Sequence, residues 1–222
     1  TDEERVELLC QANKLDREMF MSPEEMKKII DLGPEQNKFL RIMERDNGQK
    51  AFLRMFHDNR KHPDEAEISA ALKRFTSPAP KVAFSAGYGS REIDNYGGRG
   101  YYLFAQDKWF RQALMNNGFD TRTIDLDKES LDGSVDVLVI SDLRDSLSGV
   151  AMAKVQDYIA KGGNLFILGE YGRSENMNKV TSSLGVKFSD GVLVNENEYT
   201  SPTVAVGFLL KKQLKNIQLM KS

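Results

Sequence analysis

The chain of 222 residues has little of the chemistry on which most enzymes and metal sites depend. It contains one cysteine, Cys10, and two histidines, which excludes an internal disulfide and the Cys/His patterns of zinc sites. No apolar run is long enough to span a bilayer, and no signal peptide is visible. The formal net charge is −2; residues 1–76 carry 14 Lys/Arg and 16 Asp/Glu, and the remainder carries 17 of each. The absence of a basic field argues against nucleic acid as a partner.

What is present is the composition of a globular protein, with 40% apolar and 29% charged residues. We expect a helical region over residues 1–76, an α/β domain over 77–210 and a tail over 211–222 that leads to the rest of a parent protein. Because the first residue is a threonine, the chain is expected to be excised from something longer. The missing membrane segment therefore says little about that parent.

Residues 1–75 are predicted to be nearly all helical. Ser22 begins a capping box with a proline at the first helical position. Pro34 is expected to open a helix that Asn47-Gly48 interrupts and that resumes over residues 51–56. A last helix should begin at Pro63 or Asp64, and residues 76–80 form the one linker-like segment.

From Lys81 onward, short apolar runs alternate with amphipathic segments. Strands are predicted over residues 82–86, 119–126, 135–141 and 164–169, and helices over 101–117 and 148–161. Ser148 and Gly162 can cap the second helix. A short helix over 174–184 should lead to strands at 186–188 and 192–194. This alternation predicts a flavodoxin-like, mostly parallel three-layer sheet, although the connector at 127–134 is short for a parallel crossover.

Four stretches of this region together carry a family resemblance: KVAFSAGYGSRE, FRQALMNNGFDTRTIDL, VDVLVISDLRDSLS and VQDYIAKGGNLFILGEYGR. They resemble the extracytoplasmic domain of gliding-motility-type ABC transporter subunits, the "ABC-type uncharacterised transport system" family. The upstream segments PEQNKFLRIMERDNGQKAFLRMF and DEAEISAALKRF look like the helical region of Bacteroidetes permease-fused members.

The resemblance implies a fold similar to class I glutamine amidotransferases without their catalytic residues. It also implies a periplasmic domain of an inner-membrane protein, with ABC permease and ATPase subunits as partners. The sequence agrees with the missing catalysis, because the fourth strand ends at Gly169-Glu170-Tyr171-Gly172, where such an enzyme would need a cysteine.

Candidate binding residues follow three of the predicted strands, whose carboxyl ends meet at one edge of a parallel sheet. They are Tyr88, Ser90, Arg91 and Glu92 after the first strand, Asp142, Arg144 and Asp145 after the third, and Glu170, Tyr171 and Arg173 after the fourth. The carboxylates could do acid/base work or hold a cation. Arg144 and Arg173 could equally neutralise them in a structural network, which the mixed signs favour.

The loop at residues 87–100 gathers tyrosines and arginines that are typical of interfaces: Tyr88, Tyr96, Tyr101 and Tyr102, with Arg91 and Arg99. It is not a dinucleotide fingerprint, because Glu92 replaces the third glycine and the helix begins only near Tyr101. We therefore expect no cofactor. His57 and His62 are interpreted as surface residues.

Two functions remain open at this point, besides a purely structural spacer, which would show no cleft and no clustered exposed aromatics. The first is a non-catalytic domain of an ABC transport system that engages a partner or cargo. The second is a small-molecule-binding or hydrolytic α/β domain that uses the acidic and arginine loops at the sheet edge.

Overall fold

The computed structural model describes residues 1–56, 58–60 and 62–191. The chain divides into two compact units, the first made of Thr1–Pro78 and Asp107–Gly118, and the second of Ala79–Gln106 and Phe119–Ser222. The segment Asp107–Gly118 therefore interrupts the second unit along the chain and belongs to the first unit. The linker predicted at residues 76–80 contains the first of these divisions.

The first unit combines short helices with a hairpin. In chain order its elements are α1 (Asp2–Asn13), η1 (Arg17–Met19), α2 (Pro23–Ile29), η2 (Gly33–Glu35), β1 (Leu40–Glu44), β2 (Lys50–Arg54), α3 (Glu65–Arg74) and η3 (Leu114–Asn117). The capping box predicted at Ser22 is confirmed, as is the helix start at Asp64, whose side chain accepts a hydrogen bond from the Glu67 amide.

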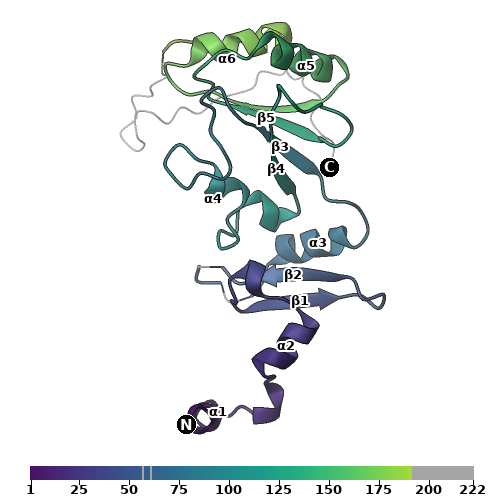
Figure 1. The fold of residues 1–222 in the computed structure, drawn as a ribbon, viewed down its shortest axis with the longest axis vertical. Helices are drawn as coiled ribbons and strands as arrows, with labels where there is room; N and C mark the ends of the chain where they lie inside the picture. Colours follow the sequence, from purple (N-terminus) through teal and green to yellow (C-terminus); the bar gives the residue numbers. More distant parts are fainter. Residues whose placement is uncertain (57, 61, 192–222) are drawn as a thin grey trace. The chain divides into compact units, whose positions relative to one another are not determined.

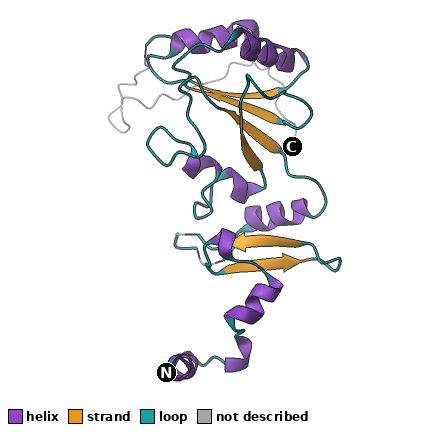
Figure 2. Cartoon of the chain, viewed as in Figure 1, coloured by secondary structure: helices purple, strands orange, loops and turns teal. Residues whose placement is uncertain are grey.

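The prediction that residues 34–56 are helical is wrong. β1 and β2 pair antiparallel, from Leu40 opposite Arg54 to Glu44 opposite Lys50 (Figure 2). Gln36 and Asn37, both with positive φ, end the short turn that Pro34 begins. Asn47-Gly48 lies in a tight connection in which Gly48, at φ 83°, donates to the Arg45 carbonyl oxygen over 2.8 Å. A left-handed glycine after a type I turn is a common hairpin connection.

The hairpin is held by one apolar face and by charges at its end. Ala51 and Leu53 of β2 are buried against Ala71 of α3, while Phe52 between them is more exposed, as the period of two in a strand requires. Arg54, at the end of β2, pairs with the buried Glu35 over 2.8 Å.

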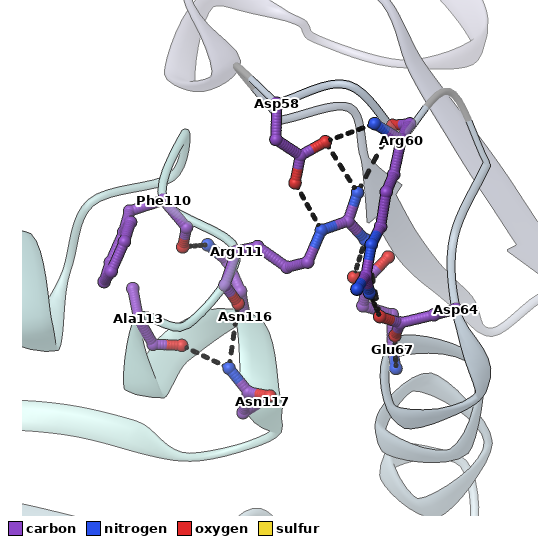
Figure 3. Close-up of polar contacts among 9 residues, drawn as sticks. All are labelled: Asp58, Arg60, Asp64, Glu67, Phe110, Arg111, Ala113, Asn116 and Asn117. Carbon is purple, nitrogen blue, oxygen red and sulfur yellow. Dashed lines mark hydrogen bonds and ion pairs between the residues drawn. The ribbon is translucent and has the colours of Figure 1, made fainter.

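The segment Asp107–Gly118 is fastened to the first unit through Arg111 (Figure 3). Its buried guanidinium group lies 2.6 Å from the Asp58 carboxylate and is also paired with Glu67, a buried residue of α3. Hydrogen bonding to Asp58 raises the pKa of Arg111, so this side chain is always charged. A buried charge of this kind needs both partners to offset its lost hydration.

The helix predicted over residues 101–117 is also largely wrong. Only α4 (Tyr102–Ala105) and the turn η3 form. The Asp107 carboxylate accepts from the Trp109 amide. The side-chain amide of Asn117 donates to the carbonyl oxygens of Arg111 and Ala113, each over 2.9 Å (Figure 3). These side chains take the backbone groups that a continuous helix would pair.

The second unit confirms the predicted parallel sheet. Its strands are β3 (Lys81–Ser85), β4 (Asp120–Ile124), β5 (Val137–Ser141) and β6 (Asn164–Leu168), in the order β4-β3-β5-β6 with every neighbour parallel (Figures 1 and 2). This is the strand order of a flavodoxin-like fold. The helices α5 (Gly149–Ala160) and α6 (Ser174–Thr181) cover one face, and α4 lies on the other (Figure 1).

The core of the second unit explains why these runs form strands. Leu138, Val139 and Ile140 of β5 are all buried, as expected of a central strand covered on both faces. Ala151 and Val155 of α5 complete one core layer. The cap predicted at Ser148 is confirmed by its acceptance of a hydrogen bond from the Ala151 amide.

The end of the chain differs from expectation or lies outside the described residues. The predicted helix 174–184 is α6 followed by the turn η4 (Ser182–Leu184). Residues 186–188 are not in a strand. The strand predicted at 192–194 and the tail at 211–222 lie outside the described residues.

Candidate functional site

The carboxyl edge of the parallel sheet carries a compact group of charged side chains, here named the carboxyl-edge cluster. Its members are Arg91, Arg99, Asp142, Glu170 and Arg173. They come from the loops after β3, β5 and β6, which are far apart in the chain and meet because parallel strands end at a common edge.

Asp142 is the fixed centre of this cluster. Its side chain is 2% exposed, and its amide donates to the Leu168 carbonyl oxygen over 2.8 Å, which continues the β5–β6 ladder by one bond. Its φ of 46° lies in the left-handed region, which is uncommon outside glycine. Burial raises the pKa of its carboxyl group. The Asp142 carboxyl group is therefore held in a buried position by a backbone conformation that residues other than glycine rarely adopt.

Two arginines bridge Asp142 to Glu170. Arg99 lies 2.5 Å from Asp142 Oδ2 through one terminal nitrogen and 2.7 Å from Glu170 Oε2 through the other. Arg91 lies 3.0 Å from Glu170 Oε1 and 3.5 Å from Asp142. The interaction with the Asp142 carboxyl group, together with these two guanidinium groups, lowers the pKa of Glu170 to about 2. Arg173 approaches the far oxygen of Asp142 at 3.8 Å.

The loops that carry the arginines are built around glycine and unusual backbone. Gly87, Tyr88 and Gly89 all have positive φ, and the Tyr88 carbonyl oxygen accepts from the amides of Arg144 and Asp145 over 2.9 and 3.1 Å. Both glycines adopt the left-handed conformation, which glycine takes without a steric penalty. The loop after β3 is thereby joined to the loop after β5 through backbone hydrogen bonds.

Other predicted site residues lie apart from the cluster. The Tyr88 hydroxyl donates to Asp127, which also accepts from Ser148 at the start of α5. The Ser90 hydroxyl donates to the Ser85 carbonyl oxygen over 2.9 Å, which stabilises the turn.

Four further candidates are exposed, namely Glu92, Arg144, Asp145 and Tyr171. Arg144 stacks its aliphatic stem over Gly89, where an added Cβ would lie 2.7 Å away, and it forms no ion pair within the described part of the chain. The interpretation that Arg144 neutralises the carboxylates is wrong. Arg91 and Arg99 do so, with Arg173.

The sequence marks Arg99 only as a member of the tyrosine- and arginine-rich loop. No strand precedes it directly, so strand-end reasoning does not select it. Tyr101 lies beside it: its ring packs on Phe84, with centroids 6.3 Å apart, and faces the guanidinium group of Arg91 at 5.7 Å. Burial raises the pKa of Tyr101, so it stays neutral beside the charges.

The chemistry that this edge displays is anion recognition by guanidinium groups. Both carboxylates of the cluster are paired with such groups. Within residues 1–56, 58–60 and 62–191, no group of His, Cys, Asp or Glu side chains is arranged to hold a metal ion. His62 is exposed, and His57 lies outside the described residues.

The second unit is thus a flavodoxin-like α/β domain with an arginine–carboxylate network at its carboxyl edge. Comparison with known families places it further: residues 79–218, more than half of the chain, match the ABC-type uncharacterized transport system family, and the chain belongs to that family. No curated protein and no solved structure matches it. No helix in the described residues has the length and apolar character to cross a membrane.

Proposed function

We propose that this chain is a non-catalytic, extracytoplasmic domain of an ABC transport system, which engages a partner or cargo at the carboxyl edge of its sheet. The observation that carries the proposal is the coincidence of boundaries. The family match begins at residue 79, and the second unit begins at Ala79. The match covers every described residue of the unit that carries the carboxyl-edge cluster, together with the segment Asp107–Gly118 of the first unit.

The finer assignment is a gliding-motility-type, amidotransferase-like domain without a nucleophile. It is supported by the position after β6, where Glu170 stands between Gly169 and Tyr171. Because its carboxylate is paired with two arginines, Glu170 is a weak nucleophile. A binding role uses the same arrangement without any further group.

The partners we propose are the permease and ATPase subunits of the same transport system, and the location is the periplasmic side of the inner membrane. Exposed aromatics on the loops at the carboxyl edge support contact with another molecule. Tyr96 and Tyr171 are 76% and 70% exposed, and tyrosine is enriched in protein interfaces.

The test is site-specific photocrosslinking in the native cells, with a benzoylphenylalanine in place of Tyr171 in the full-length protein. The matched control carries the same group in place of Val150, which is exposed on α5. We expect the Tyr171 position to crosslink to a subunit or cargo of an ABC transport system and the Val150 position not to do so. Equal crosslinking at both positions, or a product that contains only soluble cytosolic proteins, contradicts the proposal.

Location is tested separately with a cysteine. In a Cys10→Ser background, Tyr171→Cys gives this chain one thiol, at an exposed position. A membrane-impermeant maleimide should label it in cells whose outer membrane alone has been opened. Labelling that requires rupture of the inner membrane would place the domain in the cytoplasm and refute the extracytoplasmic assignment.

A further inference from the structure

The carboxyl-edge cluster is not balanced in charge or in anchoring. Three guanidinium groups face two carboxylates, which leaves one positive charge in excess. One carboxylate, Asp142, is enclosed, while the other, Glu170, is 42% exposed. The cluster therefore has a buried part, Asp142 with the arginines that it holds, and a surface part, Glu170.

The buried part is ready to hold arginines in place. Both oxygens of Asp142 are buried, and neither has a well-aligned hydrogen bond within the described residues. Their partners are the charges of Arg91, Arg99 and Arg173. Arg91 is further fixed by donation to the Gly98 carbonyl oxygen over 3.0 Å, and Arg99 by donation to that of Gly89 over 3.3 Å. The two guanidinium groups are thus pre-oriented from below.

The surface part is a single side chain from a short surface loop. Glu170 is flanked by Gly169 and, two residues on, by Gly172 at φ 74°. Each of its two oxygens is taken by a different arginine, at 3.0 Å from Arg91 and 2.7 Å from Arg99. A carboxylate from another molecule would receive the same two hydrogen bonds. Glu170 therefore shows which kind of ligand the two arginines can bind.

Resting on the proposed function, we infer that Arg91 and Arg99 form a receptor for an acidic side chain of a partner protein, and that Glu170 occupies this receptor in the free chain. Asp142 is the positioning residue beneath it. Binding of a partner exchanges one carboxylate for another and releases Glu170 to solvent.

The choice of ligand follows from the group that the arginines already hold. Glu170 presents a singly charged carboxylate, with one oxygen to Arg91 and the other to Arg99. The exposed rings of Tyr96 and Tyr171, on the loops that carry Arg99 and Glu170, suit a polypeptide more than a small ion. Since the pKa of Glu170 is about 2, neutral pH does not remove this competitor by protonation.

A side chain that already occupies the site raises the apparent Kd of an incoming ligand. The apparent Kd equals the intrinsic Kd divided by the fraction of time that the site is open. If Glu170 is seated for about nine-tenths of the time, then Glu170→Gln should bind an acidic ligand about tenfold more tightly. The probe is a fluorescein-labelled ten-residue peptide of alternating glutamate and glycine, followed by anisotropy with the whole chain. A peptide with glutamine in place of glutamate reports non-specific binding.

Matched variants separate this mechanism from general electrostatics. Glu175→Gln removes the same charge from α6, where Glu175 is 87% exposed and pairs only with Lys179 among the described residues. It should leave the affinity unchanged. Arg99→Lys keeps the charge but loses the forked geometry, and in the Glu170→Gln background it should abolish the tenfold gain. The melting temperature of each variant shows that it is folded.

The inference is overturned if Glu170→Gln and Glu175→Gln tighten binding equally, if Glu170→Gln weakens it, or if Arg99→Lys has no effect. Competition by inorganic phosphate as strong as that of the peptide would overturn the assignment to a protein side chain. The peptide assay uses purified chain alone, so its failure leaves the crosslinking result in cells untouched. Conversely, a cytosolic location would remove the extracytoplasmic assignment and leave the proposed receptor untouched.

Discussion

The buried pairing of Arg111 with Glu67 offers the sharpest test of how the first unit is held together (Figure 3). The side chains of Arg111 and Glu67 are 8% and 5% exposed. Arg111→Met would strand the Glu67 carboxylate in a buried position, with one oxygen already unpaired. Removal of one partner of a buried ion pair costs about 3–5 kcal/mol.

We expect the lower end, about 3 kcal/mol, because Glu67 can take up a proton once its partner is gone. Burial already raises the pKa of Glu67, so this escape is open to it. With an m-value of about 1.5 kcal/mol/M, the urea midpoint of the first unit should fall by about 2 M.

The assay is intrinsic fluorescence, because the only tryptophan of the chain, Trp109, lies in the segment Asp107–Gly118. Lys38 sits 3.8 Å from its ring centroid, so unfolding of the first unit should change its emission. Lys50→Met is the control: it breaks a more exposed pair, 3.8 Å from Glu44, that should contribute about 0–1 kcal/mol.

The double variant Arg111→Met with Glu67→Gln removes the stranded charge and should recover part of the loss. A midpoint shift for Arg111→Met no larger than that of Lys50→Met would refute the claim that the buried pair fastens this segment. So would a double variant that loses the sum of the two single effects, since residues in direct contact should not behave additively.

Three further predictions concern backbone and pH. Gly100→Ala should destabilise the second unit strongly, because the added Cβ would overlap the Asn95 carbonyl oxygen, whereas Gly98→Ala meets nothing within 4 Å and should be close to neutral; thermal melts of the pair decide this. Gly48→Ala, at φ 83°, should cost about 1–2 kcal/mol in the urea assay, and an unchanged midpoint would argue against the left-handed turn. Hydrogen bonds from Arg54 lower the pKa of Glu35, and those from Arg111 lower that of Asp58 to about 2. Because both folded pKa values lie below the unfolded values near 4, the stability they contribute is present above pH 4 and should be lost as the pH falls toward 2; an acid titration of Trp109 fluorescence without a transition there would contradict this.

The parallel sheet was predictable because its signal is local and redundant. Val139 and its neighbours form a short β-branched run, and a capped amphipathic helix separates it from the next run. The connector between β4 and β5 is short but still passes β3, which lies between these two strands. Lys154 donates to the carbonyl oxygens of two connector residues, Leu126 and Glu129, over 2.7 Å each. A lysine from α5 thus satisfies backbone groups that a helix would otherwise pair.

The sequence pattern does not predict the hairpin at residues 40–54, although Asn47-Gly48 is a typical hairpin turn. In the sequence, Asn47-Gly48 fits an interruption between helices as well as a turn, because the apolar residues around it fit both the helical and the strand period. The alternation of buried Ala51 and Leu53 with more exposed Phe52 is visible only once α3 covers one face. Short apolar runs do not distinguish helix from strand by themselves, and here the turn chemistry was the better evidence.

The sequence predicts where the carboxyl-edge cluster lies, but it does not predict which arginines pair with its carboxylates. Topology alone brings the loops after β3, β5 and β6 to one edge, which is why Asp142 and Glu170 were found. Arg99 reaches them only because its loop folds back: the Tyr101 amide donates to the Glu92 carbonyl oxygen over 2.9 Å, and Gly100 lets the chain pass close to Asn95. No sequence period encodes that return. A strand end fixes where a charge lies, whereas the loop's backbone decides which opposite charge meets it, and at this edge that second choice determines whether Glu170 is free or held.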